Sequence, residues 1–502
     1  MKKKLITYTS LIIGGAILLT ACKKSFLEVT PNGQFLESNY YQTPDEAFKG
    51  LVAAYDPLGM EVGSTDNTYI CILGGLNSAA DECYAGGGSS TDMNFWQVWN
   101  NYTLGAAVGP QAGYWDRNYT GLYRANLILQ KISAGVPGLS AQLQNRYIAE
   151  AKWLRAYYNF WLVRLFKNIP LLTEPLPTEE IYKVTQASPE AVYAQIEKDL
   201  KEAIADLPTS VPVSENGRIT KGAGLALLGK VIIYENNQAK MQEAANYLEQ
   251  VNSSGIYSLL PKFSDNFNPD RKYNSESIFE IGHTNAQNAG WGSWPNFEGN
   301  VYCTMVGPRS YSGPIYNAGW SFNPIIPDFA KTLYGDPRYE ATVADIDSIT
   351  KATGSSYIKG YDNTGLFINK YPPLKKYTPS VGDGNLNYPN DYTEIRLADT
   401  YLLEAEALVR GGGEMAKAQS YFDKVRARVG LASVPATLDN IYNERKLELA
   451  TEGHRWFDLV RTGKAATVLA FKGFKPGIHE LLPIPLAEMN NTLLIQNPGY
   501  EK

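Results

Sequence analysis

Three carboxylates spaced four residues apart are the first side chains in this sequence that could do chemistry. They are Glu444, Glu448 and Glu452, and this spacing places them on one face of a helix. A glycoside hydrolase needs two carboxyl groups about 5 to 9.5 Å apart, one of which has a raised pKa and acts as the acid. Glu448 and Glu452 would fit that separation, so glycoside hydrolysis is one hypothesis.

Basic residues in the same stretch favour a structural role instead. Arg445, Arg455 and Arg461 would supply cations that keep the carboxylates ionised. Apolar residues at roughly helical spacing indicate that the charges lie at the edge of a packed interface. We therefore predict one amphipathic helix over residues 441–463, with His454 as a hydrogen-bonding member of its network. Its carboxylates would hold the C-terminal helices to the rest of the fold.

Other catalytic signatures are absent from the sequence. Neither G-x-S-x-G nor H-E-x-x-H occurs, and the three histidines are too scattered in sequence to indicate a triad: His283, His454 and His479. No Cys/His cluster has zinc-ligand spacing, and no cofactor motif is found. Calcium ligands contributed by loops leave no fixed spacing, so a bound calcium stays an open alternative.

Tryptophans that are concentrated in two segments rich in Gly and Asn indicate a second possible function, which is sugar binding. Indole rings stack on the apolar faces of sugars, and Asn and Tyr side chains bond their hydroxyls. Charge is sparse, because residues 84–115 contain only Asp92 and residues 283–327 only Glu298 and Arg309. A neutral oligosaccharide is the ligand that fits best. The candidate ligand-binding residues are Trp96, Trp99, Asn101, Trp291, Trp294, Asn296, Tyr311 and Trp320.

Helices must position these segments. Thr43 with Pro44 and Glu46 predicts a capped helix to about Tyr55. Hydrophobic periodicity and cap residues predict further helices over residues 114–132, 141–166, 189–207, 219–235, 238–253, 392–409 and 414–429. Within residues 141–166, we expect a buried stripe of Trp153, Tyr157, Phe160 and Leu165. We also predict that Trp115 and Trp456 are structural.

The helices form pairs that are similar to tetratricopeptide repeats, so we predict a mostly α fold with a few short strands. Two long loop-rich segments interrupt it, residues 57–113 and 256–390, with a strand expected at 277–281. We divide the mature chain into residues 22–255 and 256–502, with a helical part at 391–470, as two parts of one compact unit. We expect the two loop-rich segments to meet in space.

The N-terminus predicts export and lipidation. Three lysines precede an apolar stretch shorter than a membrane span, and Leu19-Thr20-Ala21-Cys22 resembles a bacterial lipobox. Residues 1–21 would be removed and Cys22 acylated, which anchors the protein to a membrane. An ordinary secretory signal is the alternative. In an exported protein, Cys71 and Cys83 could form a disulfide. The net charge of −5 and the lack of a basic tract argue against nucleic acid as a partner.

The sequence resembles the SusD/RagB family of outer-membrane nutrient-binding lipoproteins over nearly the whole mature chain. In the C-terminal half, the matching motifs are Asn443-Glu444-Arg445, residues 452–459, Arg461-Thr462-Gly463, Leu482-Pro483-Ile484-Pro485 and residues 496–500. Near the N-terminus, they are Cys22 with Phe26-Leu27-Glu28, then Trp115, Tyr123, Ala125-Asn126 and Leu129.

The resemblance implies a non-catalytic protein with tetratricopeptide-like helix pairs. It would capture glycans, or in some members peptides, and deliver them to a TonB-dependent transporter of the SusC kind at the cell exterior. Lys23-Lys24-Ser25 departs from the acidic run associated with surface export, so the exterior location is implied by the family alone. A peptide-binding member and a glycoside hydrolase are the alternatives.

Overall fold

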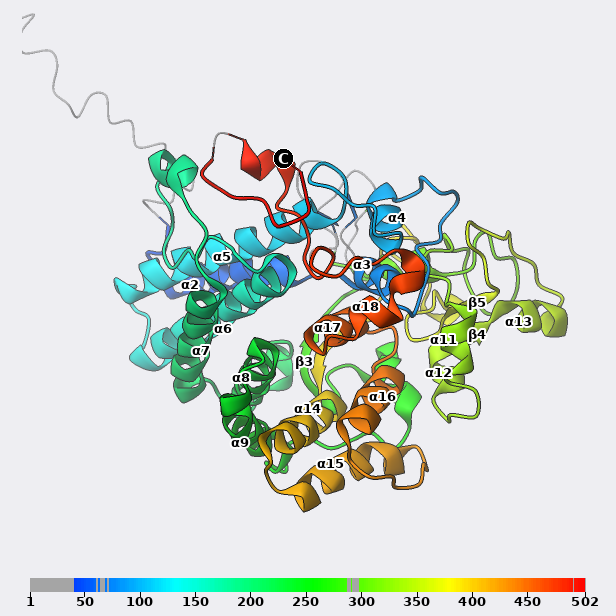
Figure 1. Ribbon diagram of the computed structural model, residues 1–502. Coiled ribbons are helices and arrows are strands. Elements are labelled where there is room, and N and C mark those ends of the chain that lie inside the picture. Colours follow the sequence, from blue (N-terminus) through cyan, green and yellow to red (C-terminus); the bar gives the residue numbers. More distant parts are fainter. Residues whose placement is uncertain are drawn as a thin grey trace, which may run out of the picture.

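A chain of helices packed side by side forms one half of the computed structural model (Figure 1). The structure describes residues 40–59, 62–63, 68–69, 72–286, 290, 298–490 and 492–501. The neighbours pack in the order α2 (Pro44–Tyr55), α5 (Gln111–Ser133), α6 (Ala141–Phe166), α7 (Pro189–Asp206), α8 (Lys221–Glu235), α9 (Met241–Asn252), α14 (Leu397–Gly411) and α15 (Met415–Arg428). This arrangement confirms the predicted mostly α fold with tetratricopeptide-like pairs.

The predicted caps form as the sequence indicates. Thr43 accepts a hydrogen bond from the backbone N–H of Glu46, whose side chain bonds the Thr43 backbone, which is a capping box. Ser188 caps α7 in the same way through the N–H of Ala191. In α6, the predicted stripe is buried: Trp153, Tyr157, Phe160 and Leu165. Trp115 and Trp456 are also buried, as predicted.

The predicted helix at residues 392–409 begins five residues too early. Tyr392–Arg396 forms strand β6, which pairs antiparallel with β3 (Ser277–Ile281), the strand that the sequence predicted. The hydrophobic pattern of this stretch did not distinguish a buried strand from a helix start. The other pairs are β1 (Val62–Gly63) with β2 (Thr68–Tyr69) and β4 (Val343–Asp345) with β5 (Leu366–Ile368).

The single helix predicted at residues 441–463 is wrong, because the chain turns within it. It forms α16 (Leu438–Glu448) and α17 (Arg455–Arg461), which are followed by α18 (Ala465–Val468). Between the first two, Thr451 and Gly453 adopt positive φ angles of 64° and 77°. Their backbone N–H groups donate to Glu82 (3.1 Å) and Asn77 (3.2 Å). Side chains of a neighbouring element thus replace the helical hydrogen bonds.

The two loop-rich segments hold more helix than the sequence predicted. Residues 57–113 contain α3 (Ile72–Ala79) and α4 (Asn94–Asn100). The second segment contains α10 (Tyr302–Val306), α11 (Pro327–Lys331), α12 (Tyr339–Thr342) and α13 (Ile346–Thr353). Gly and Asn in α3 and α4 and Pro in α11 predict turns from sequence. The helices α10, α12 and α13 have at most eight residues, which is fewer than the window in which helical periodicity is recognised.

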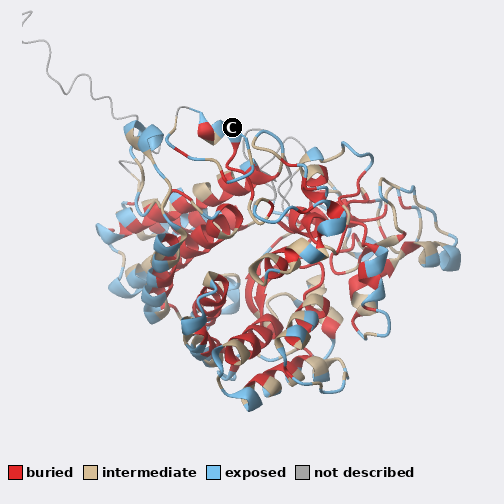
Figure 2. Cartoon of the chain, viewed as in Figure 1, coloured by how far each residue is buried: buried red, intermediate tan, exposed pale blue. Residues whose placement is uncertain are grey.

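Buried residues run through the helical half and through α3 and α4 beside it (Figure 2). No helix in the described ranges is long and apolar enough to cross a bilayer. Cys83 is a buried free thiol in the structure. Cys71, with which it could form a disulfide, lies outside the described ranges, so that pairing stays untested. Cys22 also lies outside them, so its acylation stays a prediction.

Candidate functional site

The two loop-rich segments meet through backbone pairing, as predicted. Isolated antiparallel bridges join Cys83 to Ile325 and Gly86 to Phe322. The backbone N–H of Gly87 donates to the carbonyl of Ser321 at 2.8 Å. Residues far apart in the sequence therefore form one continuous surface beside α4.

Two half-buried charged side chains lie on this surface, and we name it the Arg309 surface after one of them. It consists of Gly88, Asp92, Arg309, Trp320 and Tyr361. Arg309 donates from Nη1 to the carbonyl of Trp320 (3.1 Å), and Asp92 accepts from the N–H of Gly88 (2.7 Å). These contacts hold both side chains in place while they remain partly accessible.

A third segment completes the surface. The backbone N–H of Tyr361 donates to the carbonyl of Gly87 at 2.8 Å. The backbone N–H of Ile358 donates to the backbone carbonyl of Arg309, also at 2.8 Å. Gly87 has φ +89°, and a Cβ there would lie 2.4 Å from the ring of Phe322, so this close approach requires glycine. Tyr361 and Trp320 are both half-buried and bring aromatic rings to the same region.

These groups match the needs of sugar recognition. Arg309 forms no ion pair with a carboxylate in the part of the chain that the structure describes, so its guanidinium can donate to hydroxyl groups. Asp92 can accept from them, and the partly exposed rings can stack on C–H faces. Asp92 and Arg309 were not among the predicted ligand-binding residues, because their small number indicated only that the segments carry little charge. Their isolation within neutral segments was the signal that could have identified them.

Trp96 and Trp99 do not lie on this surface, and the prediction that they stack on a ligand is corrected. They are 1% and 0% exposed. Trp96 fills the space above Gly74, where a Cβ would lie 2.0 Å from the indole. Trp99 packs edge-on against Trp456, with ring centroids 5.5 Å apart. Their Gly- and Asn-rich flanks predicted exposure, but the glycines of α3 create the pockets that bury both rings.

The remaining predicted residues are spread out. Asn101 is exposed beyond the C-terminal end of α4, where its Oδ1 accepts from Asn100 at 2.7 Å. Tyr311 is 5% exposed and packs against Tyr316 in a separate small core, so it is not available for stacking. Three candidates lie outside the described residues: Trp291, Trp294 and Asn296.

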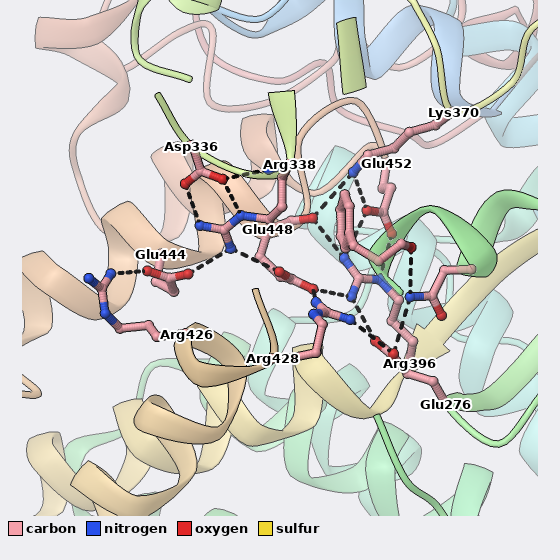
Figure 3. A network of polar contacts seen from close by, with 12 residues as sticks. Glu276, Asp336, Arg338, Lys370, Arg396, Arg426, Arg428, Glu444, Glu448 and Glu452 are labelled. Carbon is pink, nitrogen blue, oxygen red and sulfur yellow. Dashed lines mark hydrogen bonds and ion pairs between the residues drawn. The ribbon is translucent and has the colours of Figure 1, made fainter. Parts of the chain in front are cut away.

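The carboxylates of α16 and the turn after it are buried in a network of ion pairs (Figure 3). Glu444, Glu448 and Glu452 are 0%, 0% and 1% exposed. Their partners are Arg338, Lys370, Arg396, Arg426 and Arg428. The network joins the second loop-rich segment, β6 and α15 to α16, as the sequence predicted for its structural role.

The predicted cations were the wrong ones. Arg445 pairs with Asp399 and Asp458, Arg455 with Asp81, and Arg461 with Glu406 and Asp458, the residues being joined at 2.5 to 2.9 Å. Arg445 directly follows Glu444 and therefore lies on another face of α16, whereas the chain turn moves α17, with Arg455 and Arg461, away from the three carboxylates. His454 is buried beside the same charges.

This network does not provide a general acid. Burial alone would raise the pKa of Glu448, but the charges of Arg428, Arg396 and Arg338 outweigh it and hold the pKa well below its usual range. Glu452 has a lowered pKa as well: burial would raise it, but Arg396 and Lys370 prevail. A general acid needs a raised pKa, whereas the pKa values of these two enclosed carboxylates are lowered.

A second pair of carboxyl groups, Glu280 and Asp391, includes one with the raised pKa that a general acid needs. Burial and the adjacent Asp391 raise the pKa of Glu280 to about 8. Glu280 is 5% exposed and borders a cavity of about 270 Å³ together with Arg218 and Tyr257. Asp391 is bound by Lys272 at 2.6 Å. This pair is the arrangement that a test for catalysis must include. No cluster of metal-ligating side chains occurs among the residues described.

Comparison with known proteins identifies the family. A model described as the SusD family matches residues 264–500, and one described as "Starch-binding associating with outer membrane" matches residues 35–233. A solved structure of a laminarin-binding SusD-like protein is 46% identical, with a TM-score of 0.86 over 92% of this chain and 100% of that one. The chain belongs to the SusD/RagB family. Its division into residues 22–255 and 256–502 stays a prediction.

Two further proteins resemble this SusD/RagB protein over similar lengths. Surface glycan-binding protein A from Bacteroides thetaiotaomicron, solved in complex with laminarihexaose, is 28% identical, with a TM-score of 0.83 and coverage of 91% of this chain and 99% of that one. SusD-like protein P25 from Formosa agariphila is 28% identical over 95% of this chain and 96% of its own.

Proposed function

We propose that this SusD/RagB protein binds a neutral glycan at the cell surface, without catalysis, through the Arg309 surface. The observation that carries the proposal is the joining of Arg309, Asp92 and Trp320 by backbone pairing of two segments that are otherwise nearly free of charge. The 46% identical relative, which is named for laminarin binding, supports a laminarin-type glucan as the ligand.

We further propose that the glycan passes to a TonB-dependent outer-membrane transporter of the SusC kind. The resemblance to SusD proteins supports this partner, and the description of the matched model supports association with the outer membrane. Acylated Cys22 would anchor the protein there, facing the cell exterior. Co-purification of the transporter with the wild-type protein, and its loss on Cys22→Ala, tests this step.

Native electrophoresis in gels that contain laminarin, starch or another neutral polysaccharide tests the binding site. Laminarin should retard the wild-type protein, and Arg309→Ala and Trp320→Ala should each reduce the retardation. Tyr334→Ala is the matched control, because Tyr334 is an aromatic residue with 62% exposure whose ring packs against Tyr339, which does not belong to this surface. Equal retardation of all four proteins would contradict the assignment of the Arg309 surface.

The two alternatives give different results. A peptide-binding member would bind none of the glycans but would bind oligopeptides in the same buffer. A glycoside hydrolase would release new reducing ends from the glycan, and the release would disappear in Glu280→Gln or Glu448→Gln.

A further inference from the structure

A groove of about 640 Å³ lies apart from the Arg309 surface, and its volume falls within the range of sites for small ligands. Its walls come from three places in the second loop-rich segment: residues 262–269, residues 337–341 and residues 369–377. Tyr316 and Asn390 also border it. Tyr316 and Trp320 belong to one loop, so this loop contributes to both the groove and the Arg309 surface.

A buried amide oxygen at the wall of the groove has no protein partner. Asn390 is 3% exposed, and its Oδ1 has no hydrogen-bond partner in the described part of the chain. Buried polar atoms are nearly always paired, because an unpaired one loses its hydration without compensation. An unpaired oxygen at the wall of a groove indicates a ligand that pairs with it. Tyr316, which also borders the groove, carries a hydroxyl that can bond the same ligand.

The remaining walls of the groove contain apolar faces together with charged groups of both signs. Half-buried Phe267 and Tyr377 and three prolines provide the faces. Lys376 lies 3.3 Å from Asp270, and Asp265 lies 3.3 Å from Arg271, so two of the charges are neutralised within the protein. Lys262 and Glu340, of opposite sign, complete the charged groups of the lining. A ligand with hydroxyl groups, apolar faces and no net charge suits this groove.

The floor of the groove is fixed by the ion-pair network. Phe263, 5% exposed, borders the groove and carries three cations over its ring: Lys370 at 5.0 Å, Arg428 at 4.9 Å and Arg396 at 5.8 Å. The same cations bind Glu448 and Glu452. The groove is therefore preorganised, which lowers the cost of ordering on binding.

We propose that this groove is a second saccharide-binding site, which takes a short stretch of the same neutral glycan through Asn390, Tyr316 and the ring of Phe267. This inference rests on the proposed function. Peptide is disfavoured because none of the described residues that line the groove belongs to a strand along which a peptide backbone could pair. Two sites on one chain would bind a polysaccharide more tightly than either alone, provided that one glycan chain spans both.

Isothermal titration calorimetry with laminarihexaose tests the groove on the purified protein. The groove variant is Tyr316→Phe/Asn390→Leu, the surface variant is Arg309→Ala/Trp320→Ala, and Tyr334→Phe is the control. We expect two hexaose molecules per wild-type or control chain and one per chain in each double variant. The affinity of the altered site should fall at least tenfold. The melting temperature of the groove variant should stay the same or rise, since the removed Asn390 Oδ1 is buried and has no partner among the described residues.

Each other result has a definite meaning. One hexaose per wild-type chain, lost only in the surface variant, would overturn the groove and leave the proposed function standing. One hexaose lost only in the groove variant would support the groove and contradict the assignment of the Arg309 surface. Binding of oligopeptides but not of hexaose in the groove would overturn its saccharide assignment. A wild-type protein that binds no hexaose would overturn both proposals.

Discussion

Arg396 binds Glu452 through two parallel hydrogen bonds, with Nε and Nη2 each 2.9 Å from a carboxylate oxygen. The same guanidinium contacts Glu448 and Glu276. Arg396 ends β6, while Glu448 ends α16 and Glu452 lies in the turn beyond it. One cation thus ties the strand to the turn between α16 and α17. The stretch richest in charge therefore stabilises the fold, and we propose that the loops recognise the ligand.

Glu448→Gln should reduce stability without affecting glycan affinity. The change leaves three buried arginines with too little negative charge, which costs about 3–5 kcal/mol in free energy of unfolding. Urea unfolding measures this loss. Exposed Glu179→Gln is the control and should stay within about 0.5 kcal/mol of wild type. A Glu448→Gln protein that unfolds like wild type but no longer binds glycan would reverse the assignment.

His454 should make the protein sensitive to acid. Burial, with a smaller contribution from Lys230, lowers its pKa to about 3, although Asp399 and Glu452 act to raise it. An unfolded histidine has a pKa of about 6.5. Between these values the unfolded chain binds a proton that the folded chain does not, so the contribution of His454 to stability falls as the pH falls through this window.

His454→Gln isolates that contribution. From pH 5.5 to pH 4.5, wild type should lose about 1.4 kcal/mol more free energy of unfolding than the variant, which corresponds to one proton over one pH unit. Urea unfolding at the two pH values measures the difference. Parallel losses in the two proteins would mean that folded His454 takes up the proton.

Gly88→Ala should weaken glycan binding while it leaves the fold intact. A Cβ at this position would lie 2.8 Å from Nη2 of Arg309, and the flexible end of that side chain must move. We expect the affinity for laminarin to fall several-fold. Gly105→Ala is the matched control, because nothing lies within 4 Å of its added Cβ. Equal affinities for the two variants would show that the position of Arg309 does not matter.

Trp99→Ala should act on stability alone. The indole is fully buried against Tyr114 and Trp456, so its removal costs about 3–5 kcal/mol. Thermal unfolding measures the loss, and titration below the melting temperature should give the wild-type affinity. Unchanged stability with lost binding would restore the original prediction that Trp99 stacks on the ligand.

The helices were predictable because their signals are local. The cap at Thr43 and the stripe through Trp153 and Tyr157 depend on residues a few positions apart, and the structure has both. The turn at Thr451 was not predictable, since Asn77 and Glu82 stabilise it from more than 360 positions away. The prediction of the ion-pair partners of Glu448 failed for the same reason, because these partners also lie far from Glu448 in the sequence.

The candidate site was predictable only in outline. Low charge and loop-rich composition identified the two segments, and the expectation that the segments meet in space was correct. Of the candidate residues, Trp320 lies on the surface that they form. The prediction that Trp96 is exposed failed because of Gly74. Gly74 has no side chain, and this leaves space on α3 in which the Trp96 ring is buried. Sequence composition describes the flanks of a residue, whereas burial depends on what packs against it.

Titration of laminarihexaose into the purified protein, with a count of reducing ends before and after, tests the central claim most directly. We predict binding that Arg309→Ala/Trp320→Ala weakens at least tenfold at one site, with a constant number of reducing ends. No binding, or a rise in reducing ends that Glu280→Gln abolishes, would contradict a non-catalytic glycan-binding function.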